Sequence, residues 1–427
     1  MKIIWNWSHF LPIVLSRLYK AIIIVLTIIN IIIIGFYIAI WIGSASEKLF
    51  SGSDFYSIFN TIVTMKTGYS GIFIKSDIMS LFKNGILGGL VDNGVYLLQY
   101  PPFVALIFLP LSFLPFNIAF YIWTLAQVGL LICIIYIFNR LLFDWYKQER
   151  LFMTVTLLAF WPLAITFILG QFSLVILFII VQLYMALSNS KKLTAGIWLA
   201  LMIIKPQTVL IPGIISIQKR YIRTAVSFIF TSITIVLITT IIFGFRSWYK
   251  YTQLILSSSH QFENFGFAPK IEYTLRGLLT GIFGNSQSQL INIISIIFLF
   301  FGILSAWFLW LKDIPPDSPS FKLRFSFIIS LSVFLSLHLY PHDSLILVLP
   351  AALFYDFLRQ NNYPRKLYVL LILSSPFIFF FGAFNSYNLF GVIRPPLVAI
   401  IALLLYMSCY LILDIQKSFQ NTNTLLV

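Results

Sequence analysis

The sequence predicts an all-α polytopic membrane protein with a bundle of about twelve transmembrane helices. Of its 427 residues, 60% are hydrophobic and only 10% are charged, whereas a soluble domain carries about 25% charged residues. A transmembrane helix needs about 20 mostly apolar residues, and long uncharged runs recur along the whole chain. We therefore expect a single integral membrane domain over residues 1–427 and exclude soluble, disordered and fibrous proteins.

The first apolar run, Ala21 to Ser46, follows the basic residues Arg17 and Lys20. It is longer than the apolar core of a signal peptide, which has about 7–15 residues. The run therefore predicts an uncleaved first span. The segment before it contains Trp5 and Trp7 and is predicted to be an interfacial helix.

The remaining uncharged runs mark the other expected spans. They are Phe116 to Phe138, Leu151 to Leu169, Phe172 to Ser188, Thr194 to Ile204, Gln207 to Ile217, Ala225 to Gly244, Gln289 to Leu311, Phe325 to Leu339, Ser344 to Leu358, Leu367 to Phe381 and Pro395 to Leu413.

The net charge of +15 fixes the expected orientation. In a soluble protein it would suggest nucleic acid, but here it indicates the positive-inside bias and attraction to anionic membrane lipids, and no nucleic-acid partner. Most of the 28 basic residues fall in short loops on one side when both termini are cytoplasmic. The two long segments, 43–115 and 245–288, are then extracytoplasmic loops of a multi-pass protein of the plasma or inner membrane.

The uncharged stretch from Asn93 to Asn139 is long enough for two short spans. Two spans here would invert every later loop and move Arg140, Lys147 and Arg150 outside. We therefore expect one span, preceded by an interfacial helix of the first outer loop at about Pro102 to Leu114.

The sequence gives little support to a metal site. Cys133 and Cys409 both lie in apolar runs. His338 and His342 are four residues apart, as in a zinc pair on a helix, but Pro341 falls between them and no third ligand is obvious. We expect no metal and no required cofactor.

Asp54 is the first candidate for chemistry, because it follows the first span on the outer side. A carboxylate beside Phe55 and Tyr56 in a partly dehydrated setting is expected to have a raised pKa and to act as a general base. The alternative is a capping residue of a helix over Phe55 to Lys66, and the two roles are compatible.

Lys205 and Gln171 lie at breaks between apolar segments. A charge at membrane depth is a functional candidate, and the Lys205 ammonium suits a phosphate, although snorkelling to the outer interface also explains it. Gln171 follows Gly170 in a tight turn, where it either binds a substrate oxygen or caps the next helix.

The other outer polar residues are candidates for binding. His342 and Asp343 end a span and suit phosphate binding or proton transfer. In the second outer loop, His260, Glu263 and Arg276 lie among aromatic residues, a mixture that suits sugar binding but is also typical of an interfacial aromatic belt.

These segments together resemble glycosyltransferase family 87 of the GT-C superfamily, which includes polyprenol-phosphate-mannose-dependent mannosyltransferases. The similarity rests on DFYSIFN, YPPFVALIFLPLSFLPFNIAFYIWTLAQ, GQFSLVILF, GIWLALMIIKPQ and LYPHDSLILVLP, in this order from Asp54 to Pro350. The resemblance implies a polyprenyl-phosphate-linked sugar as donor, an acceptor hydroxyl deprotonated by an aspartate of the first outer loop, and inverting transfer on the extracytoplasmic face. It does not imply which acceptor is used, and we expect a lipid or glycan.

The resemblance also implies residue roles. Asp54 is then the general base, Lys205 and His342 are candidates for the donor phosphate, and the Gln171 turn lies near the sugar. Apart from the resemblance, we expect Arg276 to join the donor-binding residues. We also expect acceptor or secondary roles for five residues: Asp77, Asp92, His260, Glu263 and Asp343. Asp77 and Asp92 are also alternative carboxylates for the base.

Two other classes of function remain open. A broken helix such as the one at Lys205 also builds the midplane site of a transporter or flippase of a lipid-linked saccharide. A polymerase or ligase of surface polysaccharide shares the long outer loops. The polar residues gather on one face rather than on both sides of a midplane cavity, which favours the enzyme.

Overall fold

A computed structural model of the protein describes residues 7–46, 54–66, 100–142, 144–261, 271–312, 314–384 and 394–424. Within these ranges every regular element is a helix. Most are α-helices, and short 3₁₀ turns, labelled η, join several of them.

The N-terminal half contains α1 (Trp7–Ser46), α2 (Asp54–Lys66), α4 (Val104–Phe108), η4 (Leu111–Phe113), α5 (Phe116–Leu141), α6 (Lys147–Ala159), α7 (Trp161–Leu169), α8 (Ser173–Ser188), α9 (Lys192–Leu201), η5 (Met202–Ile204) and η6 (Pro206–Thr208). The C-terminal half contains α10 (Ile214–Ile217), η7 (Lys219–Tyr221), α11 (Ile222–Phe243), α12 (Phe245–Gln261), α13 (Leu275–Phe283), η10 (Asn285–Gln287), α14 (Ser288–Leu311), α15 (Pro319–Phe334), η11 (Pro341–Leu347), α16 (Val348–Gln360), α17 (Lys366–Phe384) and α18 (Pro395–Thr424).

Five of the described helices, α1, α5, α11, α14 and α18, are long and apolar enough to cross a membrane. A sixth span results if α6 and α7, which meet at a bend of 44°, are counted together. Shorter apolar helices accompany them in α8, α9 and α17. The chain is thus a multi-pass helical membrane protein, while the number of twelve spans stays a prediction.

Proline and glycine explain why some apolar runs do not form long helices. The expected span from Gln207 to Ile217 consists of η6, a turn and the four-residue α10. Pro206 and Pro212 have no backbone N–H to donate within a helix. Likewise, 102–114 forms only α4 and η4, which are too short to cross, and α5 then runs uninterrupted to Leu141.

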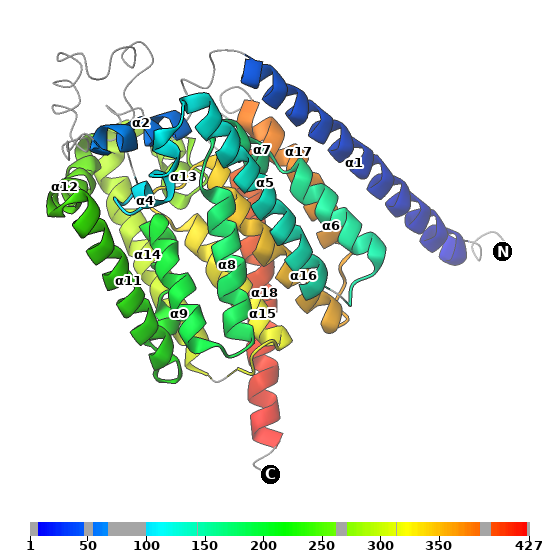
Figure 1. Ribbon diagram of the computed structural model, residues 1–427. Coiled ribbons are helices and arrows are strands. Elements are labelled where there is room, and N and C mark those ends of the chain that lie inside the picture. The colour runs from blue at the N-terminus through cyan, green and yellow to red at the C-terminus, as the bar shows by residue number, and fades with distance from the viewer. Residues whose placement is uncertain are drawn as a thin grey trace, which may run out of the picture.

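The helices form one bundle whose two ends differ (Figure 1). The short elements α2, α4 and α13 lie at one end, and the first turn of α1 and the last turn of α18 lie at the other. Close contacts between helices depend on small residues: a Cβ atom added to Gly196 in α9 would lie 2.4 Å from the Thr224 carbonyl oxygen in α11. Such close approach is typical of membrane helix pairs.

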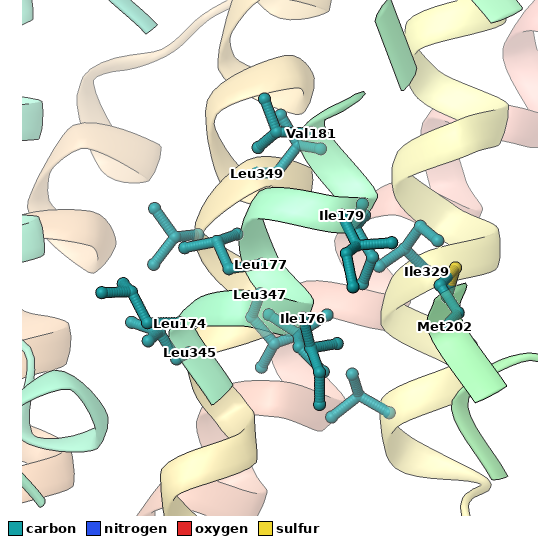
Figure 2. Close-up of a cluster of buried hydrophobic side chains, with 14 of the residues drawn as sticks. Leu174, Ile176, Leu177, Ile179, Val181, Met202, Ile329, Leu345, Leu347 and Leu349 are labelled. Carbon is teal, nitrogen blue, oxygen red and sulfur yellow. The ribbon is translucent and has the colours of Figure 1, made fainter. Parts of the chain in front are cut away.

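The hydrophobic core lies around α8, which is buried on nearly every side. Figure 2 shows side chains of α8 against η11, α16, α15 and η5. Leu174 and Ile176 of α8 and Leu345 of η11 are fully buried. This core fixes the first turn of α8 against η11, and the polar side chains of both elements extend from it.

Candidate functional site

The turn between α7 and α8 forms the centre of the site. Gly170 ends α7 with φ of +67°, a left-handed conformation that favours glycine. Two side chains of α5 hold the turn: Trp123 Nε1 donates to the Gly170 carbonyl at 2.9 Å, and Gln127 Nε2 donates to the Gln171 carbonyl at 3.2 Å. A Cβ atom on Gly170 would lie 2.6 Å from Cβ of Phe55, so the glycine also allows α2 to approach.

Gln171 links Asp54 to Tyr100. The Gln171 amide nitrogen donates a hydrogen bond to Oδ2 of Asp54, the first residue of α2. The Tyr100 hydroxyl donates to Gln171 Oε1 at 2.6 Å. Because each end of the amide has a partner of the appropriate kind, its orientation is fixed and its N–H groups face the carboxylate.

The environment of Asp54 changes its basicity. Partial burial raises the pKa of the Asp54 carboxyl above its ordinary value, since a carboxylate loses hydration there. The hydrogen bond from Gln171 and the positive charge of Lys205 act in the opposite direction, and the negative charge of Asp343 adds to the rise. The result is a carboxylate that binds a proton more readily than an exposed aspartate.

Lys205 lies in an extended break between η5 and η6. Its ammonium is 2.5 Å from Oδ1 of Asp343, which also accepts a hydrogen bond of 2.9 Å from Ser173. The same ammonium lies 5.6 Å from the centre of the Tyr100 ring, a cation–π geometry. The break at Lys205 therefore brings a buried cation next to the amide that holds Asp54.

His342 completes this group. Its Nε2 is 3.4 Å from Lys205 Nζ, and since an ammonium only donates, Nε2 is the acceptor and Nδ1 carries the proton. Burial lowers the pKa of His342 to about 3, so the imidazole is neutral at physiological pH. The pKa of Asp343 is also lowered: burial raises it, but the Lys205 charge and the hydrogen bonds from Lys205 and Ser173 outweigh that effect.

A second polar group surrounds Glu272, whose side chain is almost fully buried. Glu272 Oε1 accepts from Arg276 at 3.1 Å and lies 2.8 Å from His338 Nδ1. Arg276 Nε donates to Asn292 at 3.0 Å, which ties α13 to α14. Arg276 therefore binds the Glu272 carboxylate and the Asn292 side-chain amide, whereas Lys205 binds Asp343 and His342.

Tyr340 connects the two groups. Its ring centre is 4.8 Å from that of His338 and 5.9 Å from that of His342. In addition, Gln207 Nε2 donates to the His338 carbonyl at 2.9 Å. A chain of mostly buried side-chain contacts thus runs from Asp54 to Arg276 across elements that are far apart in the sequence.

The structure unites some of the expected residues and leaves others untested. It brings together Asp54, Gln171, Lys205, His342 and Asp343 and places Arg276 in the adjoining group. Gln171 uses its side chain for Asp54 and Tyr100, while the cap of α8 is Phe172. Asp77, Asp92 and Glu263 lie outside the described residues, and only the backbone of His260, near the end of α12, is described.

The sequence prediction assigned no site role to five members of the site: Tyr100, Ser173, Glu272, His338 and Tyr340. His338 was weighed only as half of a zinc pair. Ser173 had a signal, because it lies two residues after Gln171 in the same turn. Tyr100 directly precedes the Pro101–Pro102 pair, which indicated only a short, kinked helix. The Glu272–His338 contact joins residues 66 positions apart, and no local sequence pattern predicts it.

The arrangement connects a carboxylate with a buried cation through the side chains of Gln171 and Tyr100. Asp54 can accept a proton, and the Lys205 ammonium can donate to an anion because, among the described residues, Asp343 and His342 take two of its three N–H groups. Among the described residues, no three or more His, Cys, Asp or Glu side chains gather as a metal site. The residues present suit proton transfer and phosphate binding.

Comparisons with known proteins point to one family. The profile of glycosyltransferase family 87 matches residues 98–337, a range that includes Tyr100, Gln171 and Lys205. A polyprenol-phosphate-mannose-dependent α-(1-2)-phosphatidylinositol pentamannoside mannosyltransferase of Mycolicibacterium smegmatis is 32% identical over 104 residues. That alignment covers 24% of each chain, so the chain spans about a quarter of the length of this curated relative.

No solved structure matches the chain. The family match, however, extends over more than half of the 427 residues, although Asp54, His342 and Asp343 lie outside the matched range. The chain therefore belongs to glycosyltransferase family 87.

Proposed function

We propose that the protein transfers a hexose or pentose, with mannose the first choice, from a polyprenyl-phosphate donor to a lipid or glycan acceptor on the extracytoplasmic face of the membrane. The observation that carries the proposal is the placement of Asp54, a carboxylate of raised pKa, beside the buried cation of Lys205. The family membership and the name of the mycobacterial relative support the choice of donor.

In the proposed reaction, Asp54 accepts the proton of an acceptor hydroxyl. The hydroxyl oxygen forms a bond to the anomeric carbon of the sugar while the bond from that carbon to the phosphate oxygen breaks. The electron pair of the broken bond stays on the polyprenyl phosphate. A single displacement inverts the anomeric centre and needs one base. The second carboxylate of a glycoside hydrolase, which protonates the leaving group, is not required because the phosphate leaves without protonation.

The leaving phosphate gains negative charge, which the Lys205 group is suited to stabilise. The third N–H of the Lys205 ammonium, which has no partner among the described residues, and the Nδ1–H of neutral His342 are both donors for phosphate oxygens. Asp343 does not contact the phosphate in this scheme: it accepts from Lys205 and Ser173 and so positions the ammonium. The phosphate is a good leaving group, so the scheme uses no metal.

The test is transfer from labelled polyprenyl-phosphate mannose by the purified protein in lipid vesicles, with glucose and arabinose donors in parallel. We expect one donor to give a glycosylated product of inverted anomeric configuration. Asp54→Asn should lower the rate about 100-fold or more, as loss of a general base does, while Asp144→Asn, an exposed carboxylate at the other end of the bundle, should retain activity.

Three results would overturn the proposal. The first is full turnover by Asp54→Asn, and the second is a product with retained configuration. The third is movement of a lipid-linked saccharide across the vesicle membrane without any new glycosidic bond, which would instead support the transporter.

A further inference from the structure

A cavity lies at the end of the bundle opposite Gln171. It has a volume of about 170 Å³ and lies between α1, α6 and α17, with Tyr19, Trp145, Glu149, Tyr355, Arg365 and Lys366 among its lining residues. We call it the basic crevice. Figure 1 shows α1 as the outermost helix on this side, next to α17 and α6.

The basic crevice carries excess positive charge. Arg365 lies 5.9 Å from the Tyr355 ring centre and Lys366 lies 5.7 Å from that of Tyr19. Neither cation forms an ion pair with an acidic side chain in the described part of the chain. Glu149, the carboxylate of the crevice, already accepts from the Tyr355 hydroxyl at 2.5 Å.

Exposure and neighbouring charge make the cations available to a ligand. Arg365 is half-buried and Lys366 is exposed. Arg17 and Lys20, two exposed residues of α1, flank the crevice residue Tyr19 in sequence. The four cations outnumber Glu149, so an anion at the rim of the crevice is favoured.

An apolar cavity adjoins the basic crevice. A cavity of about 420 Å³ lies between α6, α16, α17 and α18, and it shares Met153 and Ile372 with the crevice. The lining of this cavity includes Leu371, Leu403 and Phe379. Tyr368 also lines it, and its hydroxyl donates to the Ala351 carbonyl at 3.0 Å. A basic rim next to an apolar cavity is complementary to an amphiphile with an anionic headgroup.

We propose that the basic crevice binds a diacyl phospholipid with an anionic headgroup. Its phosphate lies on Arg365 and Lys366, and one acyl chain follows α6 and α17 into the apolar cavity. Basic pockets between transmembrane helices are known to hold anionic lipid headgroups. The lipid contacts α1, α6 and α17 together and thereby fixes the peripheral helix α1.

This lipid is distinct from the proposed sugar donor, and the inference does not depend on the proposed function. The donor phosphate belongs at Lys205, at the end of the bundle where α7 meets α8, whereas Arg365 and Lys366 begin α17 at the other end. One phosphate cannot occupy both places.

The headgroup is tested by binding to the purified full-length protein, with dioleoyl phosphatidylglycerol and dioleoyl phosphatidylcholine as probes in native mass spectrometry. We expect the anionic lipid to be retained in preference. The double variant Arg365→Gln/Lys366→Gln should weaken its binding about 30-fold, since each cation near a membrane surface contributes about fivefold.

The matched control is Lys191→Gln/Lys192→Gln, which removes two cations at the same end of the bundle, one of them also over a tyrosine ring, Tyr221. This control should bind the anionic lipid as tightly as the unchanged protein. Equal losses in both double variants would show a diffuse charge effect and overturn the site, as would equal retention of the two lipids by the unchanged protein.

The placement of the acyl chain is tested separately with Ile372→Trp, a larger side chain at a residue that lines both cavities. We expect weaker binding of dioleoyl phosphatidylglycerol and unchanged binding of its dihexanoyl analogue, because the short chains do not pass this point. Leu405→Trp, at an exposed position of α18 outside both cavities, is the control and should change neither. A loss of both lipids in Ile372→Trp, or of neither, contradicts the placement of the chain.

Discussion

Tyr100 donates a hydrogen bond of 2.6 Å to Gln171 Oε1, and this contact keeps the amide nitrogen of Gln171 directed at Asp54. An amide can rotate by half a turn with little change in shape, and the rotated form would place an oxygen against the carboxylate. The Tyr100 hydroxyl disfavours that form because burial raises its pKa well above the ordinary value, so it stays protonated and donates.

Tyr100→Phe should therefore change the basicity of Asp54 and not only the rate. Without the hydroxyl, Gln171 donates less to the carboxylate, and the pKa of Asp54 rises further. We expect the acid limb of the pH profile of kcat/KM to move up by about one pH unit. A hydrogen bond to a charged group contributes about 1.5–3 kcal/mol, and partial loss of the bond from Gln171 raises the pKa of Asp54 by about that much.

Phe172→Leu is the control for this substitution. The Phe172 ring lies 5.0 Å from the Tyr100 ring, so its loss loosens the same aromatic group but leaves the hydroxyl in place. It should lower thermal stability without moving the acid limb. If both variants shift the limb equally, Tyr100 acts only through packing.

The pH dependence of the unchanged protein follows from Asp54 itself. A general base works when it is ionised, and burial raises the pKa of Asp54. Activity should therefore rise with pH and reach its plateau above the raised pKa, at a higher pH than for an ordinary aspartate near 3.9. A profile of kcat/KM from pH 3.5 to 8 checks this, and an acid limb at or below pH 3.9 would be inconsistent with a buried base.

Lys205 should be needed for both stability and transfer. Lys205→Met leaves Asp343 as a buried carboxylate without its cation, which costs about 3–5 kcal/mol. The double variant Lys205→Met/Asp343→Leu removes both charges and should recover most of the thermal stability. It should not recover transfer, because the phosphate still lacks its cation.

Thermal unfolding in one detergent and donor-dependent turnover measure the two effects of the Lys205 variants side by side. Recovery of turnover together with stability would show that the ion pair only supports the fold. In that case Lys205 has no direct role at the phosphate.

Gly170→Ala tests the attachment of α2. The new methyl group would lie 2.6 Å from Cβ of Phe55, and the residue keeps a φ of +67°. We expect the backbone conformation alone to lower the free energy of unfolding by about 1–2 kcal/mol. Activity should also fall, because α2 and Asp54 must move away from the methyl group. Gly129→Ala in α5 is matched, since its methyl group meets nothing within 4 Å, and it should be neutral or stabilising. Similar activity in the two variants would argue against this contact.

Much of this arrangement could be expected from the sequence. The apolar runs predict a helical membrane protein, the helix after Asp54 runs to Lys66 as expected, and the break at Lys205 and Pro206 is present. These features are local: they depend on composition, proline and capping chemistry. The same is true of the tight turn at Gly170.

The contacts between distant segments could not be predicted in this way. The Gln171 amide is 117 positions from Asp54, and the Lys205 ammonium is 138 positions from Asp343. Such pairs depend on how α8, η11 and the break at Lys205 come together around the core, which no single segment specifies. The sequence placed these side chains on one face, but the assignment of donor to acceptor required the three-dimensional structure.

The site has two parts that belong to different elements, and they meet at the contact between Gly170 and Phe55. Asp54 enters on the short helix α2, which rests on the bundle through the Phe55 contact, whereas Lys205, His342 and Asp343 belong to the core of the bundle. Sequence change in α2 can therefore remodel the surface around the base while the ion pair remains intact. In the proposed scheme, substitutions in α2 would change the choice of acceptor while the Lys205–Asp343 ion pair on the donor side stays intact.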